Sequence, residues 1–299
     1  LREHRMNPPC GLLNLNKPAG TTSRRVVDHV ERLARRVKCG HAGTLDPLAS
    51  GVLVVGVGAA TRLIEFVQKM PKCYTGTFLL GRQSATEDID GDVTELENPP
   101  IPSQNQIASA AAALTGRIQQ RPPAYSALKI AGRRAYELAR KGEQVELKPR
   151  SVMVYRLEAV AYDYPKLRLE IECGSGTYVR SLGRDLAESL GTAAVMSGLV
   201  RTAIGSFRIE DSVDPGHLNR QNWTDCLLPP MRAVEFLPQV ELTAGEIARV
   251  RTGQAIPKPL PKSHSKEFAA LDTAGRLVAI LVPRGPGLLG PGRNLPPGD

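Results

Sequence analysis

Residues 40–51 read Gly-His-Ala-Gly-Thr-Leu-Asp-Pro-Leu-Ala-Ser-Gly, and this segment constrains both the fold and the chemistry of the chain. Its carboxylate, Asp46, follows His41 by five residues and directly precedes Pro47. The proline restricts Asp46 to an extended or turn conformation, and the apolar run at 52–55 is typical of a buried strand. We therefore expect a rigid loop at a sheet edge that presents Asp46, as catalytic loops do. The alternative to a catalytic loop is an ordinary turn, because Asp-Pro commonly initiates a turn.

Strands and helices alternate irregularly on both sides of this segment, which predicts an α+β fold. Apolar or alternating runs predict strands over 11–16, 52–57, 73–80, 151–162 and 166–173. Helical spacing, capping residues and glycine stops predict helices from Thr22 or Ser23 to Val37, and over 61–68, 103–116 and 179–190.

A domain boundary is expected near Leu237 and Pro238, which gives one domain over 6–237 and a second over 238–299. The second contains a capping box at Thr243 and a pair of short apolar runs typical of a β-hairpin. About 60 residues of short strands favour a small β-barrel. The first domain is counted from Met6, because residues 1–5 are expected to reflect the choice of start site.

The composition indicates an anionic partner. The chain has 299 residues, 41% of them hydrophobic, and a formal net charge of +9, which favours nucleic acid over a membrane. Nine Lys and Arg against three acids lie in 117–150, and six against two lie in 24–38. One such run is usually a solvated face, but a second run directly before the Asp46 loop favours an RNA-binding surface.

The cysteines and the hydropathy indicate the compartment. The five cysteines are odd in number and include no C-x-x-C pair, so we expect free thiols and neither a disulfide framework nor a zinc site. No apolar run approaches the length of a membrane span. The expectation is a soluble cytoplasmic protein without a metal.

The segment at 40–51 resembles the catalytic loop of the TruB family of pseudouridine synthases, in which the aspartate is essential. Four other stretches resemble family motifs in the same order along the chain: GLLNLNKPAG at 11–20, KCY at 72–74, GSGTYVRSL at 174–182 and LVRT at 199–202. The PPAYSALK stretch at 122–129 resembles the family's RNA-gripping thumb insertion. One departure is the acidic loop at 81–91, which lacks the usual Thr-Asp at its first pair.

The resemblance covers roughly residues 11–237 and favours the bacterial, stand-alone type of the family. It implies a pseudouridine-synthase core whose central sheet is mixed, largely antiparallel and flanked by helices. It further implies a thumb insertion over 117–150 and, more weakly, a small PUA-like β-barrel at the C-terminus. The implied partner is the T-stem-loop of tRNA. No membrane and no obligate protein partner are implied, and a monomer is sufficient.

The resemblance also implies an activity and a set of site residues. The activity is the isomerisation of uridine to pseudouridine at position 55 in the tRNA T-loop, on a flipped-out base and without a cofactor. Asp46 is implied as the essential carboxylate, Arg180 as its ion-pair partner and Tyr74 as the residue that stacks on the base. His41 is implied as a wedge in the space that the base leaves. The remaining implied substrate-binding residues are Tyr178, Lys17, Leu199, Arg62 and Lys129.

The chemistry of the reaction fits one carboxylate. Breaking the N1–C1′ bond, turning the base and rejoining it through C5 needs no redox step and no group donor. Asp46 could act as a nucleophile or as a base on a ribose proton, and the sequence leaves both open. A neighbouring guanidinium favours the ionised carboxylate. Stacking is worth roughly 1–3 kcal/mol for each base, against a few kcal/mol for extruding it.

Two other functions are compatible with parts of the sequence. The Gly-x-Gly at 56–58 follows a strand, as in dinucleotide-binding enzymes, but the third glycine of that motif is missing. A non-catalytic RNA-binding protein or tRNA-folding chaperone would use the basic surfaces alone, and would not need Asp46, Tyr74 and Arg180. This second alternative stays open at the level of the sequence.

Overall fold

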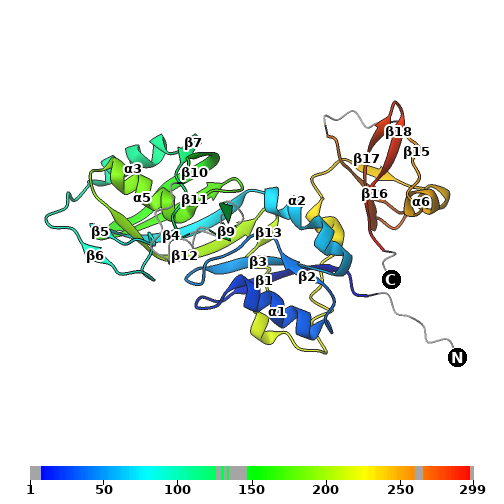
Figure 1. The fold of residues 1–299 in the computed structure, drawn as a ribbon, viewed down its shortest axis with the longest axis horizontal. Coiled ribbons are helices and arrows are strands. Elements are labelled where there is room, and N and C mark those ends of the chain that lie inside the picture. The colour runs from blue at the N-terminus through cyan, green and yellow to red at the C-terminus, as the bar shows by residue number, and fades with distance from the viewer. Residues whose placement is uncertain (1–7, 126–128, 131–132, 135–146, 260–264, 297–299) are drawn as a thin grey trace.

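The computed structural model describes residues 8–125, 129–130, 133–134, 147–259 and 265–296. A nine-stranded sheet runs through the larger part of the molecule, with a path of seven strands in the order β1-β3-β12-β4-β11-β10-β7 (Figure 1). Along the path, only the β3–β12 pair is parallel. The sheet is therefore mixed and largely antiparallel, as predicted. Its strands are β1 (Gly11–Lys17), β2 (Cys39–His41), β3 (Ser50–Val57), β4 (Lys72–Leu80), β7 (Gly116–Gln120), β10 (Arg150–Asp163), β11 (Lys166–Cys173), β12 (Ala194–Ile204) and β13 (Phe207–Arg208).

Helices cover the two ends of this sheet. Helix α1 (Ser23–Leu33) begins at Thr22, whose side chain accepts from the Arg25 backbone N–H, and its buried valines join the apolar cluster of β1 and β3. Helix α3 (Gln104–Ala113) lies against β10, and α5 (Val179–Ser189) lies against β12. The helix predicted over 61–68 is divided instead, into a 3-10 helix η1 (Gly58–Leu63) and helix α2 (Ile64–Lys69). Two further 3-10 helices are η2 (Pro215–His217) and η3 (Pro230–Ala233).

Two short hairpins leave the central sheet. Strands β5 (Arg82–Gln83) and β6 (Thr94–Glu95) close the acidic loop that follows β4. Strands β8 (Lys129–Ile130) and β9 (Arg133–Arg134) pair inside the predicted thumb insertion. Half of that insertion, 126–128, 131–132 and 135–146, lies outside the described residues.

A second sheet forms the C-terminal unit, with the order β14-β16-β17-β18-β15 (Figure 1). Its elements are β14 (Gln239–Glu241), α6 (Ala244–Arg251), β15 (Ile256–Pro257), β16 (Phe268–Leu271), β17 (Leu277–Gly285) and β18 (Leu288–Asn294). The capping box at Thr243 and the hairpin of β16 and β17 were expected, and both are present. Strand β18 was not expected, because its Pro and Gly residues obscure the strand pattern. Its register is irregular against β17, which is how a strand accommodates such residues.

The two units share an apolar cluster. Leu63, Phe66 and Val67 of η1 and α2 belong to the same buried cluster as Ala269, Leu277, Ile280 and Leu295. Arg293 of β18 forms ion pairs with Glu65 and Glu267, and its guanidinium lies 4.8 Å from the centre of the Phe66 ring. The C-terminal sheet is thereby fixed to α2. Within the described ranges, we find no helix with the length and apolar character needed to cross a membrane.

Candidate active site

A pocket of about 500 Å³ opens where the Asp46 loop meets β4, β12 and the segment that leads into α5. This volume is within the range of small-molecule sites. The lining residues combine four segments that are far apart in the sequence: 43–46, Gln68 with Lys72 and Tyr74, 174–180, and Leu199 with Arg201. Five of the predicted site residues line this pocket, namely Asp46, Tyr74, Tyr178, Arg180 and Leu199.

The Asp46 loop is held at both ends by hydrogen bonds. The Ser23 hydroxyl accepts from the Leu45 backbone N–H at 2.9 Å and donates to the Leu45 carbonyl at 3.1 Å. The Pro47 carbonyl accepts from the Gly20 N–H at 2.8 Å. The loop is therefore anchored on both sides of Asp46 by residues 20–23, while the Asp46 side chain keeps 39% of its surface exposed.

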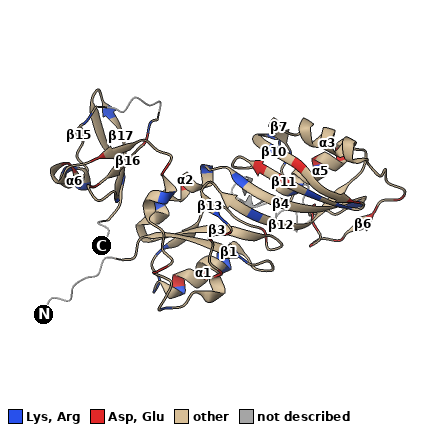
Figure 2. Ribbon diagram, turned by 180° about the vertical axis from the view of Figure 1, so that it is seen from behind, with Lys and Arg blue, Asp and Glu red and all other residues tan. Residues whose placement is uncertain are grey.

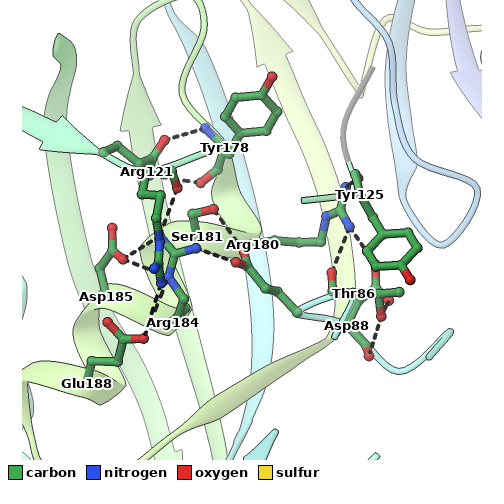
Figure 3. Close-up of polar contacts among 12 residues, drawn as sticks. Thr86, Asp88, Arg121, Tyr125, Tyr178, Arg180, Ser181, Arg184, Asp185 and Glu188 are labelled. Carbon is green, nitrogen blue, oxygen red and sulfur yellow. Dashed lines mark hydrogen bonds and ion pairs between the residues drawn. The ribbon is translucent and has the colours of Figure 1, made fainter. Parts of the chain in front are cut away.

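Arg180, at the start of α5, pairs with Asp46 as the resemblance implied. Its Nη2 lies 3.1 Å from Asp46 Oδ2 and donates to the Tyr125 carbonyl at 3.0 Å. Its Nη1 donates to the Thr86 carbonyl at 2.8 Å and to Asp88 Oδ2 at 3.1 Å. Figure 3 shows this side chain reaching Thr86, Asp88 and Tyr125. The guanidinium is thus fixed by four oxygens, only one of which belongs to Asp46.

Asp88 is a buried residue next to the site, and no motif in the sequence indicates it. Its side chain is 6% exposed, and its Oδ1 accepts from the Thr86 hydroxyl at 2.6 Å and from the Asp90 N–H at 3.2 Å. The only signal for it was the acidic loop at 81–91. Nothing local distinguished Asp88 from its neighbours, because the arginine that it binds lies 92 residues away.

Tyr74 and Arg201 form the wall between β4 and β12. They face each other in the strand register, and Tyr74 is 8% exposed. Burial raises the pKa of the Tyr74 hydroxyl, and the nearby Arg201 charge opposes this rise. Arg201 is almost fully buried and donates to the Val52 carbonyl at 2.7 Å and to the Gly43 carbonyl at 3.1 Å. Arg201, another residue absent from the predicted site, therefore ties the sheet to the Asp46 loop.

Two buried lysines lie beneath the site. The Lys17 amine donates to the carbonyls of Pro18 and Thr21, and the Lys72 amine donates to those of Gln68 and Met70. Burial lowers the pKa of each to about 8. For Lys17, Asp46 opposes this fall. Lys72 lines the pocket, whereas Lys17 does not.

The backbone at Tyr178 is fixed by Gln120 of β7. The Gln120 amide accepts from the Tyr178 N–H at 2.8 Å and donates to the Tyr178 carbonyl at 3.1 Å. Gln120 is buried. Because Tyr178 precedes the first residue of α5, this pair of bonds also fixes where the helix carrying Arg180 begins.

Four predicted residues lie away from the pocket lining, namely Lys17, described above, and His41, Arg62 and Lys129. His41 is on β2, opposite Val55 of β3, and burial lowers its pKa. Arg62 donates to the Asn294 carbonyl at 2.7 Å and so contacts the C-terminal unit. Lys129 is on β8, and its side chain is outside what the structure describes. Basic and acidic positions both occur on the central sheet (Figure 2). Within the described ranges no cluster of three His, Cys, Asp or Glu could hold a metal.

Comparison with known sequences identifies one family model and several relatives that agree with it. Residues 31–179 match the model of the TruB family pseudouridylate synthase (N terminal domain). The tRNA pseudouridine synthase B of Dehalococcoides mccartyi (strain ATCC BAA-2266 / KCTC 15142 / 195) is 38% identical over 91% of this chain and 92% of its own length. The protein of the same name from Cutibacterium acnes is 40% identical over 91% and 93%.

Solved structures show the same fold. A chain in the crystal structure of a Cbf5-Nop10-Gar1 complex superposes with a TM-score of 0.70 at 27% identity, covering 93% of this chain and 79% of that one. A chain of an H/ACA RNP bound to a substrate RNA containing 2'-deoxyuridine gives 0.72 at 23% identity, over 99% and 93%. The pseudouridine-synthase core is therefore confirmed. Together with the curated relatives, it shows that this chain belongs to the TruB family of pseudouridylate synthases.

Proposed function

We propose that this protein isomerises uridine to pseudouridine in tRNA, at position 55 of the T-loop, with Asp46 as the catalytic carboxylate. The observation that carries the proposal is the ion pair of Asp46 and Arg180 at 3.1 Å in a pocket that Tyr74 also lines. The names of the curated relatives support tRNA as the substrate. The T-loop and the position within it come from the motif resemblance.

Each of the site residues has a separate role in the proposed reaction. Arg180 and its buried partners hold the Asp46 carboxylate toward the sugar of a flipped-out nucleotide. Tyr74 offers its ring face to the base, which compensates in part for the loss of base stacking. Asp46 acts either on the nucleotide as a nucleophile or on a ribose proton as a base, and both routes need the same placement. His41 would fill the position in the RNA that the base leaves.

The proposal extends to the division of the chain and to its partner. Residues 6–237 form the catalytic domain, and 238–299 form a PUA-like RNA-binding domain. The basic thumb insertion at 117–150 grips the T-stem-loop, and Lys129 and Arg62 contribute to RNA binding. The protein acts as a monomer without an obligate protein partner. The charge of the chain, +9, supports binding to a polyanion.

The test is tritium release from tRNA that carries C5-tritiated uridine, with the wild type and Asp46→Asn compared side by side. C5 loses its hydrogen when it becomes the glycosidic carbon, so release reports the isomerisation directly. We expect the wild type to release one equivalent for each tRNA and Asp46→Asn to release none while it still binds tRNA. Filter binding on the same preparations measures the second point.

Two results would contradict the proposal. Binding of tRNA without release by the wild type would leave a non-catalytic RNA-binding protein or tRNA-folding chaperone. Undiminished release by Asp46→Asn would place the catalytic carboxylate elsewhere. When the wild type releases tritium, mapping of pseudouridine along the product strand locates the modified position. A position other than 55 would refute the T-loop assignment alone.

A further inference from the structure

Arg184 lies one helical turn after Arg180 on α5 and repeats its pattern of contacts. Arg180 binds the Asp88 carboxylate and the Tyr125 carbonyl. Arg184 forms an ion pair with the Glu87 carboxylate and donates to the Arg121 carbonyl at 2.8 Å. Figure 3 shows the two side chains leaving the same helix, one toward Asp88 and Tyr125 and the other toward Arg121. The two arginines therefore bind the same two segments, the acidic loop and residues 121–125 of the thumb insertion.

Glu87 lies in the part of the acidic loop that contacts Arg180. It stands between Thr86 and Asp88, the residues whose oxygens accept from Arg180 Nη1. Its Oε2 accepts from the Ser181 hydroxyl at 2.9 Å, and its side chain is 13% exposed. Both contacts of the Glu87 carboxylate are to α5. Holding this side chain consequently fixes two of the four oxygens that orient Arg180.

The backbone of Glu87 has an unfavourable conformation, so the contacts of its side chain with α5 are needed to maintain it. Its φ is +61°, in the left-handed region that is unfavourable for a residue with a Cβ. Glycine is the residue that adopts this conformation without penalty. A glutamate at this position therefore has an unfavourable backbone conformation, which its two side-chain contacts with α5 offset.

Arg184 is fully engaged within the protein. Its Nη1 pairs with Glu87, its Nη2 donates to the Arg121 carbonyl and to Asp185, and its Nε also donates to Asp185. Its side chain is 11% exposed. All three guanidinium nitrogens thus have protein partners, which argues against a direct contact of this arginine with an RNA phosphate.

We infer that Glu87 and Arg184 are a positioning pair for Arg180: they fix the acidic loop and residues 121–125 on α5, and so set the direction in which Arg180 presents itself to Asp46. This inference rests on the proposed function of Asp46. Neither residue is among those that line the pocket. Misplacement of a reacting group by a distant substitution lowers the rate of the chemical step more than it lowers binding.

The test uses Glu87→Gly, which deletes both side-chain contacts while suiting the left-handed backbone. Asn98→Gly is the matched control, because Asn98 is an exposed residue that also has a positive φ, 47°. Single-turnover tritium release at saturating enzyme gives the rate of the chemical step, and filter binding gives the Kd for tRNA. We expect Glu87→Gly to lose roughly 10- to 100-fold in rate, with Kd within about twofold of the wild type. Asn98→Gly should change neither.

A double-mutant cycle with Arg184→Met tests whether the two residues act as a pair. If they do, the loss of rate in the double variant is clearly smaller than the sum of the two single losses on a free-energy scale. Additive losses, a wild-type rate in Glu87→Gly, or a loss confined to Kd would each overturn the inference. Including Asp46→Asn in the series separates the two proposals. An inactive Asp46→Asn beside a fully active Glu87→Gly refutes the positioning pair only, whereas no release by the wild type refutes both.

Discussion

Asp46 and Asp88 bind the same guanidinium from opposite nitrogens, each at 3.1 Å, yet one is 39% exposed and the other 6%. Two carboxylates beside one arginine share its single charge. The exposed Asp46 can meet a substrate, while the buried Asp88 is hydrogen-bonded to Thr86 and Asp90 and cannot. Asp88 therefore serves to hold Arg180, and Asp46 remains available for chemistry.

Asp88→Asn should separate these two roles. The amide keeps the size of the carboxylate but removes a buried negative charge, so we expect the free energy of unfolding to fall by up to about 3 kcal/mol. The single-turnover rate should fall at least about tenfold, because Arg180 loses one of its fixed partners. Asp90→Asn is the control, since the Asp90 side chain is exposed. Equal effects of the two substitutions would count against a special role for Asp88.

Tyr74→Leu should lower the rate by removing the ring that lines the pocket. The expected loss corresponds to roughly 1–3 kcal/mol of stacking on the flipped base. Tyr74→Phe keeps the ring face and should retain more activity than Tyr74→Leu. Single-turnover release and thermal melting on both variants distinguish a stacking effect from simple loss of packing. The same rate loss in both variants would move the role from the ring to the hydroxyl.

Gly51→Ala should disturb the Asp46 loop through Arg201. A Cβ at Gly51 would lie 2.2 Å from the Arg201 carbonyl oxygen, and the φ of this glycine is +102°. Gly20→Ala is the matched control, because Gly20 has a φ of +79° but no atom within 4 Å of the added Cβ. We expect urea denaturation to show a loss of about 1 kcal/mol for Gly20→Ala and about 3 kcal/mol or more for Gly51→Ala. Similar losses would mean that backbone conformation, and not the close approach, decides the effect.

Lys72 should make stability depend on pH between about 8 and 10.5. Burial lowers its pKa from 10.5 to about 8, so in this interval the unfolded chain binds more protons than the folded one. Stability from this residue is fully present above 10.5 and is lost as the pH falls through 8. Relative to Lys72→Met, the wild type should gain up to about 1.4 kcal/mol for each pH unit across the interval. Parallel stability curves for the two proteins would refute a lowered pKa.

Much of the fold could be predicted from local signals. The cap at Thr22 and the alternation along β4 and β11 each act within a few residues, and each is present in the structure. The pairing of Asp46 with Arg180 was available only through the resemblance to a family. From composition and spacing alone, Asp46 and Arg180 are each a candidate site residue, and nothing indicates that the two form a pair.

The rest depends on contacts between distant segments. Asp88 and Arg201 are buried charges, and a charge in a sequence ordinarily indicates an exposed side chain. Asp88 is compensated by Arg180 of α5, and Arg201 donates to the carbonyls of Val52 and Gly43, so these partners meet only in the folded chain. Strand β18 was missed because its Pro and Gly residues hide a pairing that β17 enforces. Arg62 was predicted for RNA binding, and its contact with Asn294 could not be foreseen from a motif.

The shared cluster of α2 and the C-terminal sheet has a consequence for biosynthesis. Arg62 and Asn294, which are bonded in the folded protein, are 232 residues apart in the chain. At about 5–20 residues per second, a ribosome needs roughly 10 to 50 s to make the intervening segment. Until then the apolar side chains of Leu63, Phe66 and Val67 have no partner from β16 to β18. The nascent chain therefore carries an uncovered apolar surface on η1 and α2 until β16 to β18 have been synthesised.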